Sequence, residues 1–384
     1  HNTAIGVQAG NTLTTTSNTT LLGSQAGYYA TADGTVAVGY QTLHLATSGA
    51  GNTAMGYRAG YSLGTGHSNT FIGYEAADAF NSGEHDMTAI GRNAMGSADN
   101  DSSSNCVAIG VGALEGGSGV ITNTVAIGNN ALSSTNARNV DASIAIGLAA
   151  MDSTAGGAVT DCIAIGRDSM HHSSNQLNAV TGDIGIGAYS LQSLTTGDYN
   201  IAIGYQAGKS VTTGGGNTAV GSFALSQRTT GIYNVAVGKN ALSGSATGNY
   251  SVAIGVDAMK AGASGSDNIA VGYQALLNDQ SKENVAIGSK ALYTHYGLNN
   301  GHEAMSNATT ADRSVAIGYR AGYKKKVNGN SVFVGNLAGH NEISGSANTA
   351  VGGGAGYGFD GDNLYGTAIG ADALLTTGGR KDYT

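Results

Sequence analysis

The chain has 384 residues, enough for two or three globular domains, but it contains 63 Gly, no Pro, no Trp and only 11% charged residues. The absence of Pro excludes collagen, and a hydrophobic content of 41% is too high for a disordered linker. The formal charge is −8 and the 17 Lys plus Arg are scattered, so no nucleic-acid partner is expected. No apolar run approaches the ~18 residues of a membrane-spanning helix, so no membrane insertion is expected either.

A short motif recurs along almost the whole chain. Its first copy is Asn2-Thr3-Ala4-Ile5-Gly6, and we number each copy from its closing Gly as position zero. This position is occupied 22 times, mostly 16 to 19 residues apart, at 6, 23, 39, 56, 73, 91, 110, 128, 147, 166, 187, 204, 221, 238, 255, 272, 288, 301, 318, 335, 352 and 370. A unit of ~17 residues is too short for a helical hairpin and is typical of one coil of a β-solenoid.

The residues just before each closing Gly predict a short strand. Position −3 is Thr, Val or Ile and position −1 is aliphatic in 21 copies each, and we expect this face to form the core. Position −2 is Ala in 17 copies, which predicts a flat apolar face approached closely by another backbone. That backbone belongs either to the same thin coil or to a neighbouring subunit.

A second buried corner follows each strand. Position +3 is Ala in 19 copies, and position +4 is Leu or Met in 14 and Gly in 7. Polar residues and a Thr-Gly or Ser-Gly turn then lead to the next copy. Asn recurs at position −4, where stacked amides can hydrogen-bond from coil to coil.

These patterns predict an all-β parallel β-solenoid, or β-roll, of about 22 rungs of ~17 residues, forming a rod on the order of 100 Å long. We expect one repetitive solenoid over residues 1–378 and an exit segment over 379–384. In copy 18, Leu298-Asn299-Asn300-Gly301 places Asn at −1, so we expect a bend, a bulge or a satisfied polar layer there.

Copies such as Ser251-Val252-Ala253-Ile254-Gly255 resemble the head repeats of trimeric autotransporter adhesins, and the longer unit, as in residues 200–214, is similar to repeats of bacteriophage tail fibres. The resemblance covers nearly the whole chain. It implies a left-handed, trimeric β-roll and an extracellular location on a virion tail fibre or a bacterial cell surface. Adhesin-head repeats are shorter, near 14 residues, so the ~17-residue unit favours the phage-fibre variant.

Three functions are compatible with such a rod. The first is a fibre shaft or a receptor-binding adhesin segment, with a cell-surface glycan or protein as receptor. The second is an ice- or crystal-binding solenoid, because the pairs Thr195-Thr196, Thr212-Thr213 and Thr229-Thr230 recur every 17 residues. The third, a polysaccharide-cleaving enzyme, is disfavoured because the acidic residues fall mostly in variable turns, and we expect no enzymatic activity.

A flat apolar face on every rung would be a large exposed patch, so the pattern also predicts a homotrimer whose Ala and Gly faces pack together. The rival interpretation places these faces inside a thin single-chain coil.

The most variable segments are the candidate target-binding sites. Copies between Gly73 and Gly187 are longer than the others, and their extra residues must bulge outward. An exposed Tyr row at +1 leads into this region and could add a stacking surface. Neutral loop drift is the alternative explanation of the long copies, since loops tolerate insertion at little cost. The candidate residues are Tyr40, Tyr57, Tyr74, Glu84, His85, Asp99, Asp101, Arg138, His171 and His172.

No cofactor or metal site is expected. Cys106 and Cys162 share position −4 three rungs apart, ~14 Å from each other and too far for a disulfide within one chain. The spacing of Cys and His matches no zinc motif, and the pair His171-His172 is more simply explained as exposed loop histidines than as a metal site.

Overall fold

The computed structural model describes residues 1–14, 16–80, 83–97, 103–116, 119–133, 139–152, 157–171, 177–244, 247–261, 266–277, 285–291, 315–324, 330–341, 347–359 and 365–374, and the backbone of 298–300. These residues form an all-β parallel β-solenoid, as the repeat predicts. The chain divides into two compact units, His1–Tyr199 and Asn200–Thr384. The predicted exit segment 379–384 lies outside the described residues.

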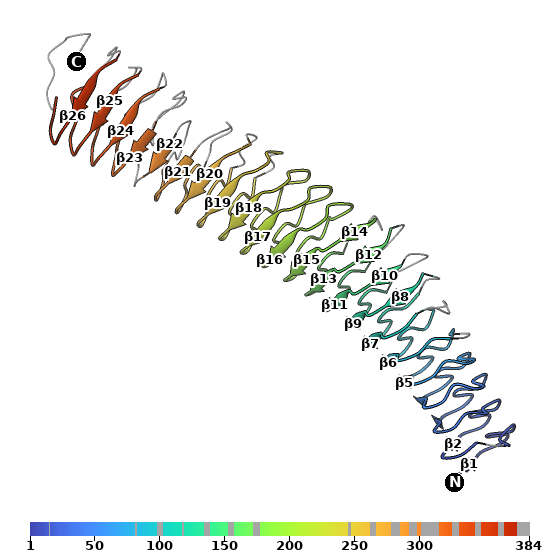
Figure 1. Ribbon diagram of the computed structural model, residues 1–384. Coiled ribbons are helices and arrows are strands. Elements are labelled where there is room, and N and C mark those ends of the chain that lie inside the picture. The colour runs from blue at the N-terminus through green and yellow to red at the C-terminus, as the bar shows by residue number, and fades with distance from the viewer. Residues whose placement is uncertain are drawn as a thin grey trace. The chain divides into compact units, whose positions relative to one another are not determined.

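Each coil contributes one three-residue strand that ends at the closing Gly of the repeat, and successive strands lie side by side within each unit (Figure 1). In the first unit these are β1 (Thr3–Ile5), β2 (Thr20–Leu22), β3 (Val36–Val38), β4 (Thr53–Met55), β5 (Thr70–Ile72), β6 (Thr88–Ile90), β7 (Val107–Ile109), β9 (Val125–Ile127), β11 (Ile144–Ile146), β13 (Ile163–Ile165) and β15 (Ile184–Ile186). In the second unit they are β16 (Ile201–Ile203), β17 (Thr218–Val220), β18 (Val235–Val237), β19 (Val252–Ile254), β20 (Ile269–Val271), β21 (Val285–Ile287), β22 (Leu298–Asn300), β23 (Val315–Ile317), β24 (Val332–Val334), β25 (Thr349–Val351) and β26 (Thr367–Ile369).

The strands of neighbouring coils pair in parallel and in register. Ala219 of β17, for example, faces Ala236 of β18, and the same repeat positions face each other throughout each unit. A second parallel sheet forms where the copies are longest. It contains β8 (Ile121–Thr122), β10 (Val140–Asp141), β12 (Val159–Thr160) and β14 (Val180–Thr181).

The prediction for the core face was wrong. The residues at −2 are buried, as Ala37, Ala54 and Ala236 show with no exposed surface, whereas those at −3 and −1 are half-buried or exposed. The coil is so thin that Ala at −2 packs against the equally buried Ala at +3, and the bulky β-branched residues are left outside. The rival interpretation of the Ala face is therefore confirmed, and packing of these faces between subunits is excluded.

Where a large residue occupies the interior, a neighbouring coil carries a smaller one. Phe71 replaces Ala at −2 of β5, and the neighbouring coil carries Gly60 at +4, where most copies carry Leu or Met. A Cβ at Gly60 would lie 2.8 Å from the Phe71 ring and 2.7 Å from Leu43. Such complementary changes keep the interior filled at the density of other protein cores.

The corners of the coil rest on a left-handed backbone at residues other than glycine. Gln41 at +2 has a φ of 54° and Leu43 at +4 a φ of 50°, and the same two positions recur in most coils. This conformation costs roughly 1–2 kcal/mol per residue in an isolated chain. Packing of Leu43 in the interior and the ladder bonds of the coil hold it in place.

The predicted amide column at −4 is confirmed. In the second unit the Asn217 side chain donates to the Asn200 Oδ1 atom (3.0 Å) and to the Gly231 carbonyl (2.8 Å), and it accepts from the backbone N–H of Asn234 (2.9 Å). Asn52 and Asn69 continue the same pattern in the first unit. The role of these buried amides is structural.

The irregular copy 18 keeps its place in the sheet. Asn299 and Asn300 of β22 pair with Ala286 and Ile287 of β21, and all three residues of β22 pair with β23. The strand itself contains no bulge in its described backbone. A satisfied polar layer was also predicted here, but the side chains of Asn299 and Asn300 are outside the described part of the structure.

Candidate functional site

The predicted tyrosine row at +1 forms a ladder on the surface of the first unit. The rings of Tyr40 and Tyr57 stack with centroids 5.5 Å apart, and those of Tyr57 and Tyr74 with centroids 5.0 Å apart. All three side chains are exposed. Because the rings cover one another's faces, the ladder presents ring edges and hydroxyl groups to a ligand, whereas the sequence led us to expect open stacking faces.

A polar ladder runs beside the tyrosines at +2. The Gln25 amide donates to Gln8 (3.1 Å), the Gln41 amide donates to Gln25 (2.8 Å), and the Arg58 Nε donates to the Gln41 oxygen (3.1 Å). Glu75 occupies the same position one coil later. Its charge is the main cause of the raised pKa of the Tyr74 hydroxyl.

The sequence reasoning missed a second aromatic ladder at +5. Tyr28 stacks on His44 with centroids 5.0 Å apart, and His44 stacks on Tyr61 at 5.2 Å and an angle of 1°. The guanidinium of Arg58 lies 4.7 Å from the centre of the Tyr61 ring, so it joins the two ladders. The recurrence of an aromatic residue at +5 in three successive copies, as Tyr28, His44 and Tyr61, was the available signal.

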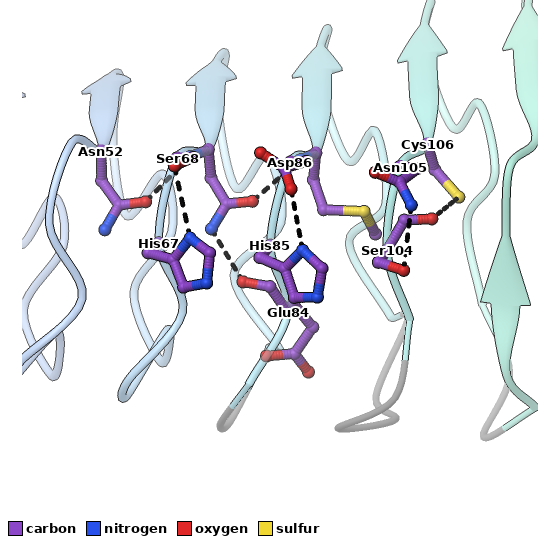
Figure 2. A network of polar contacts seen from close by, with 11 residues as sticks. Asn52, His67, Ser68, Glu84, His85, Asp86, Ser104, Asn105 and Cys106 are labelled. Carbon is purple, nitrogen blue, oxygen red and sulfur yellow. Dashed lines mark hydrogen bonds and ion pairs between the residues drawn. The ribbon is translucent and has the colours of Figure 1, made fainter.

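Glu84 and His85 lie where the coils lengthen (Figure 2). Glu84 is fully buried and its carbonyl accepts from the Asn69 amide (3.0 Å), so it is not part of an exposed surface. His85 stacks on His67 of the previous coil with centroids 5.0 Å apart, and its Nδ1 lies 2.9 Å from the Asp86 carboxylate. His67 is exposed and the His85 side chain is 39% exposed, and the next coil places Ser104 and Asn105 beside this pair.

The other loop candidates are dispersed. His171 is half-buried, with its Nδ1 3.2 Å from the Asp168 carboxylate. His172, Asp99, Asp101 and Arg138 lie outside the described residues. Within the described part of the chain, the structure therefore brings together the three tyrosines but not the loop residues.

A shallow groove of about 430 Å³ lies on the second unit. Its polar lining includes Gln227, Ser243, Asp257, Lys260 and Gln274, and the Lys260 ammonium lies 3.2 Å from the Asp257 carboxylate. Burial acts to raise the pKa of Asp257, but hydrogen bonds from Asn240 and Lys260 and the Lys260 charge outweigh it and leave the pKa below its usual value.

Three further observations concern the predicted threonine ladder, metal binding and membrane insertion. The hydroxyl of Thr212 donates to the Thr229 carbonyl of the next coil (2.9 Å), so its proton is used in a bond along the threonine ladder. No group of three or more His, Cys, Asp or Glu side chains that could hold a metal ion occurs among the described residues. In the same part of the chain, no helix is long and apolar enough to cross a membrane.

Both cysteines are buried free thiols. Burial, the largest cause, raises the pKa of Cys106 to about 11 and that of Cys162 to about 12. Because the thiolate is the reactive form, we expect neither thiol to react measurably with a maleimide at pH 7.5 in the native protein, and both to react in urea. Mass spectrometry of the quenched reaction checks this result. Rapid labelling of the native protein would contradict the burial.

The ladders and the groove can recognise a ligand without covalent chemistry, through hydroxyl, amide and guanidinium groups beside aromatic rings. Comparison with models of protein families, with curated proteins and with solved structures found no match.

Proposed function

We propose that this chain is a structural segment of a homotrimeric extracellular fibre, serving as the shaft or the receptor-binding part of a virion tail fibre or a cell-surface appendage. The observation that carries the proposal is a row of exposed aliphatic side chains at −1. Exposed fractions in this row run from 36% to 72% at Ile5, Leu22, Met55, Ile72, Ile109, Ile203, Ile254, Ile287, Ile317, Val351 and Ile369.

The row forms a large apolar surface on each unit. At about 4.8 Å per rung and about 10 Å per three-residue strand, the strands of one unit present roughly 500 Å². Each unit therefore presents more than half of the roughly 800 Å² that each partner contributes to a stable protein interface.

In a homotrimer, the face of each chain packs against the same face of the other two chains. Every rung repeats the same side chains at the same height, so identical chains in parallel bring like residues together around a common axis. The interface lies at −3 and −1, and not at the Ala column that the sequence favoured. The repeat pattern and the resemblance to fibre and adhesin repeats support the extracellular assignment.

Light scattering on the purified chain tests the assembly. We expect a mass of three times 38.1 kDa. Replacing Ile203, Val220 and Val237 by glutamate places charges on three successive rungs of the row and is expected to give folded monomers. Replacing Thr213 and Thr230, which are exposed on the turns, by glutamate should leave the trimer intact.

A folded, soluble monomer formed by the unmodified chain would overturn the proposed assembly. Circular dichroism of each variant separates loss of association from loss of folding.

A further inference from the structure

Tyrosine occupies an unusual backbone position in several copies of the repeat. The four most exposed tyrosines among the described residues all lie at −5, with exposed fractions from 54% to 75%: Tyr199, Tyr233, Tyr250 and Tyr365. Each has a left-handed backbone, with φ between 54° and 59°. From Asn18 to Gly182, the same position is always Gly, Ala, Ser, Asn or Asp.

Folding alone does not explain tyrosine at this position. A bulky residue in the left-handed conformation costs free energy of folding, which Gly largely avoids and Asn tolerates better. A ring that stays mostly exposed regains little of this cost through burial. Backbone strain at an exposed side chain is a recognised mark of a binding site.

Two of these tyrosines lie on successive coils of the second unit and form a stack. The rings of Tyr233 and Tyr250 have centroids 5.7 Å apart and are inclined by 12°. The Tyr233 ring covers Gly216 on the preceding coil, where an added Cβ would lie 2.5 Å from a ring carbon. The N–H of Tyr250 donates to the Ile232 carbonyl (3.1 Å), so the backbone of the stack is fixed by the ladder between coils.

The stack leaves one ring face in contact with solvent. Tyr233 covers one face of Tyr250, yet Tyr250 is still 54% exposed, so its other face is open toward the next coil. That coil carries Asp267 at −5, which is also exposed. The Asp267 side chain is shorter than a tyrosine ring, so its carboxylate borders the space in front of the ring without filling it.

The chemistry of this site favours a neutral sugar. Positions −7 to −5 read Gly-Gly-Gly, Gly-Ile-Tyr, Gly-Asn-Tyr and Gly-Ser-Asp on the four coils from 214–216 to 265–267, so Asp267 carries the only charge among them. A carboxylate accepts strong hydrogen bonds from hydroxyl groups and repels an anionic ligand. A sugar ring with equatorial hydroxyls has apolar faces of C–H groups that pack on an aromatic ring.

We propose that Tyr250, backed by Tyr233, and Asp267 bind a neutral, equatorially substituted sugar of a surface glycan. The C–H face of the sugar packs on the Tyr250 ring, and hydroxyl groups at its rim donate to the Asp267 carboxylate. This inference rests on the proposed function, since it names the receptor chemistry of the fibre. Because −5 lies outside the row at −3 and −1, we expect the site to stay accessible in the trimer.

Titration calorimetry of the full chain with cellohexaose tests the inference, and the β-1,4-linked hexamer of glucuronate serves as the charged probe of the same length. We expect the unmodified chain to bind the neutral hexamer at least tenfold more tightly than the acidic one. The variant Y250N should lose at least tenfold in affinity for cellohexaose, and Y233N/Y250N should show no measurable binding. The variant D267N should lose several-fold and discriminate less between the two hexamers.

Tyr273 provides the matched control. It is an exposed tyrosine of the same unit, at +1 and without positive φ, and Y273N should bind cellohexaose as the unmodified chain does. Asparagine is the replacement because Asn105 and Asn123 already occupy −5 with the same backbone. We therefore expect Y250N to unfold at the same or a higher urea concentration than the unmodified chain. A clearly lower unfolding midpoint would show that the ring serves the fold, which overturns the inference.

The inference is also overturned by equal affinity for the two hexamers, by undiminished binding in Y233N/Y250N, by an equal loss in Y273N, or by no binding of cellohexaose to the unmodified chain. Light scattering of the same samples keeps the two proposals apart. A trimer that does not bind the sugar contradicts this inference alone, and a monomer that binds it contradicts the proposed assembly alone. Loss of the trimer in Y233N/Y250N would place the rings in the subunit interface and overturn the sugar site.

Discussion

Replacing Gly56 by alanine is expected to destabilise the first unit by about 3–5 kcal/mol, among the largest effects of any single substitution. Gly56 has a φ of 140°, a conformation that side-chain-bearing residues rarely adopt. An added Cβ would lie 2.1 Å from the carbonyl oxygen of Gly73 on the next coil. That atom is backbone and cannot move without separating the two rungs.

Two other glycines distinguish the cost of the left-handed backbone from the cost of the steric clash with the next coil. Gly34 has a φ of 69°, but an added Cβ would meet nothing closer than 3.8 Å, so G34A should cost only about 1 kcal/mol. Gly353 has open space around it, and G353A should be nearly neutral. Urea unfolding gives the three values, and hydrogen exchange of the Thr53–Met55 amides locates the damage. A cost for G56A equal to that for G34A would show that the rungs separate freely.

Replacing Asn217 by leucine is the second large change. Leucine has nearly the same size, but it removes the acceptor for the Asn234 N–H and the donor to the Gly231 carbonyl. Both groups would be left buried without these partners, at about 1–3 kcal/mol each, so the variant should lose about 3–5 kcal/mol of unfolding free energy. Denaturant unfolding of the second unit measures the loss.

Serine at the same position is the matched control. Ser251 already occupies this column, where its hydroxyl accepts from the Asn268 N–H (3.3 Å). Asn217→Ser therefore restores the acceptor but not the reach to Gly231, and about 1–2 kcal/mol should be lost. If leucine and serine have the same cost, the amide column contributes little beyond its volume.

The architecture was predictable because one short sequence motif recurs in 22 copies. The spacing of the closing glycines predicted parallel coils in register, and the Asn at −4 predicted the amide column around Asn52 and Asn217. The orientation of the strand was not predictable from residue size. Isoleucine and valine are normally the interior residues, and only the thinness of the coil explains why Ala236 lies inside while Val235 and Val237 do not.

The candidate site was harder to predict from the sequence than the fold was. The tyrosine ladder at +1 was predictable because Tyr40, Tyr57 and Tyr74 recur at one position of three successive copies. The ladder at +5 required the left-handed turn at +2, which brings residues separated by a corner to one surface. Glu84 was expected on the surface because it is charged and lies in a long copy, but the path of the backbone there buries it.

The left-handed corners also restrict which amino acids the repeat can use. Across all 22 copies, neither +2 nor +4 carries Val, Ile or Thr, although these residues dominate −3, only five and seven positions earlier. A branched Cβ is strongly disfavoured at positive φ. This periodic exclusion is a signature that depends on backbone geometry and not on the Asn-x-Ala-Ile-Gly letters. It should identify coils of this kind in chains whose strands have diverged beyond recognition.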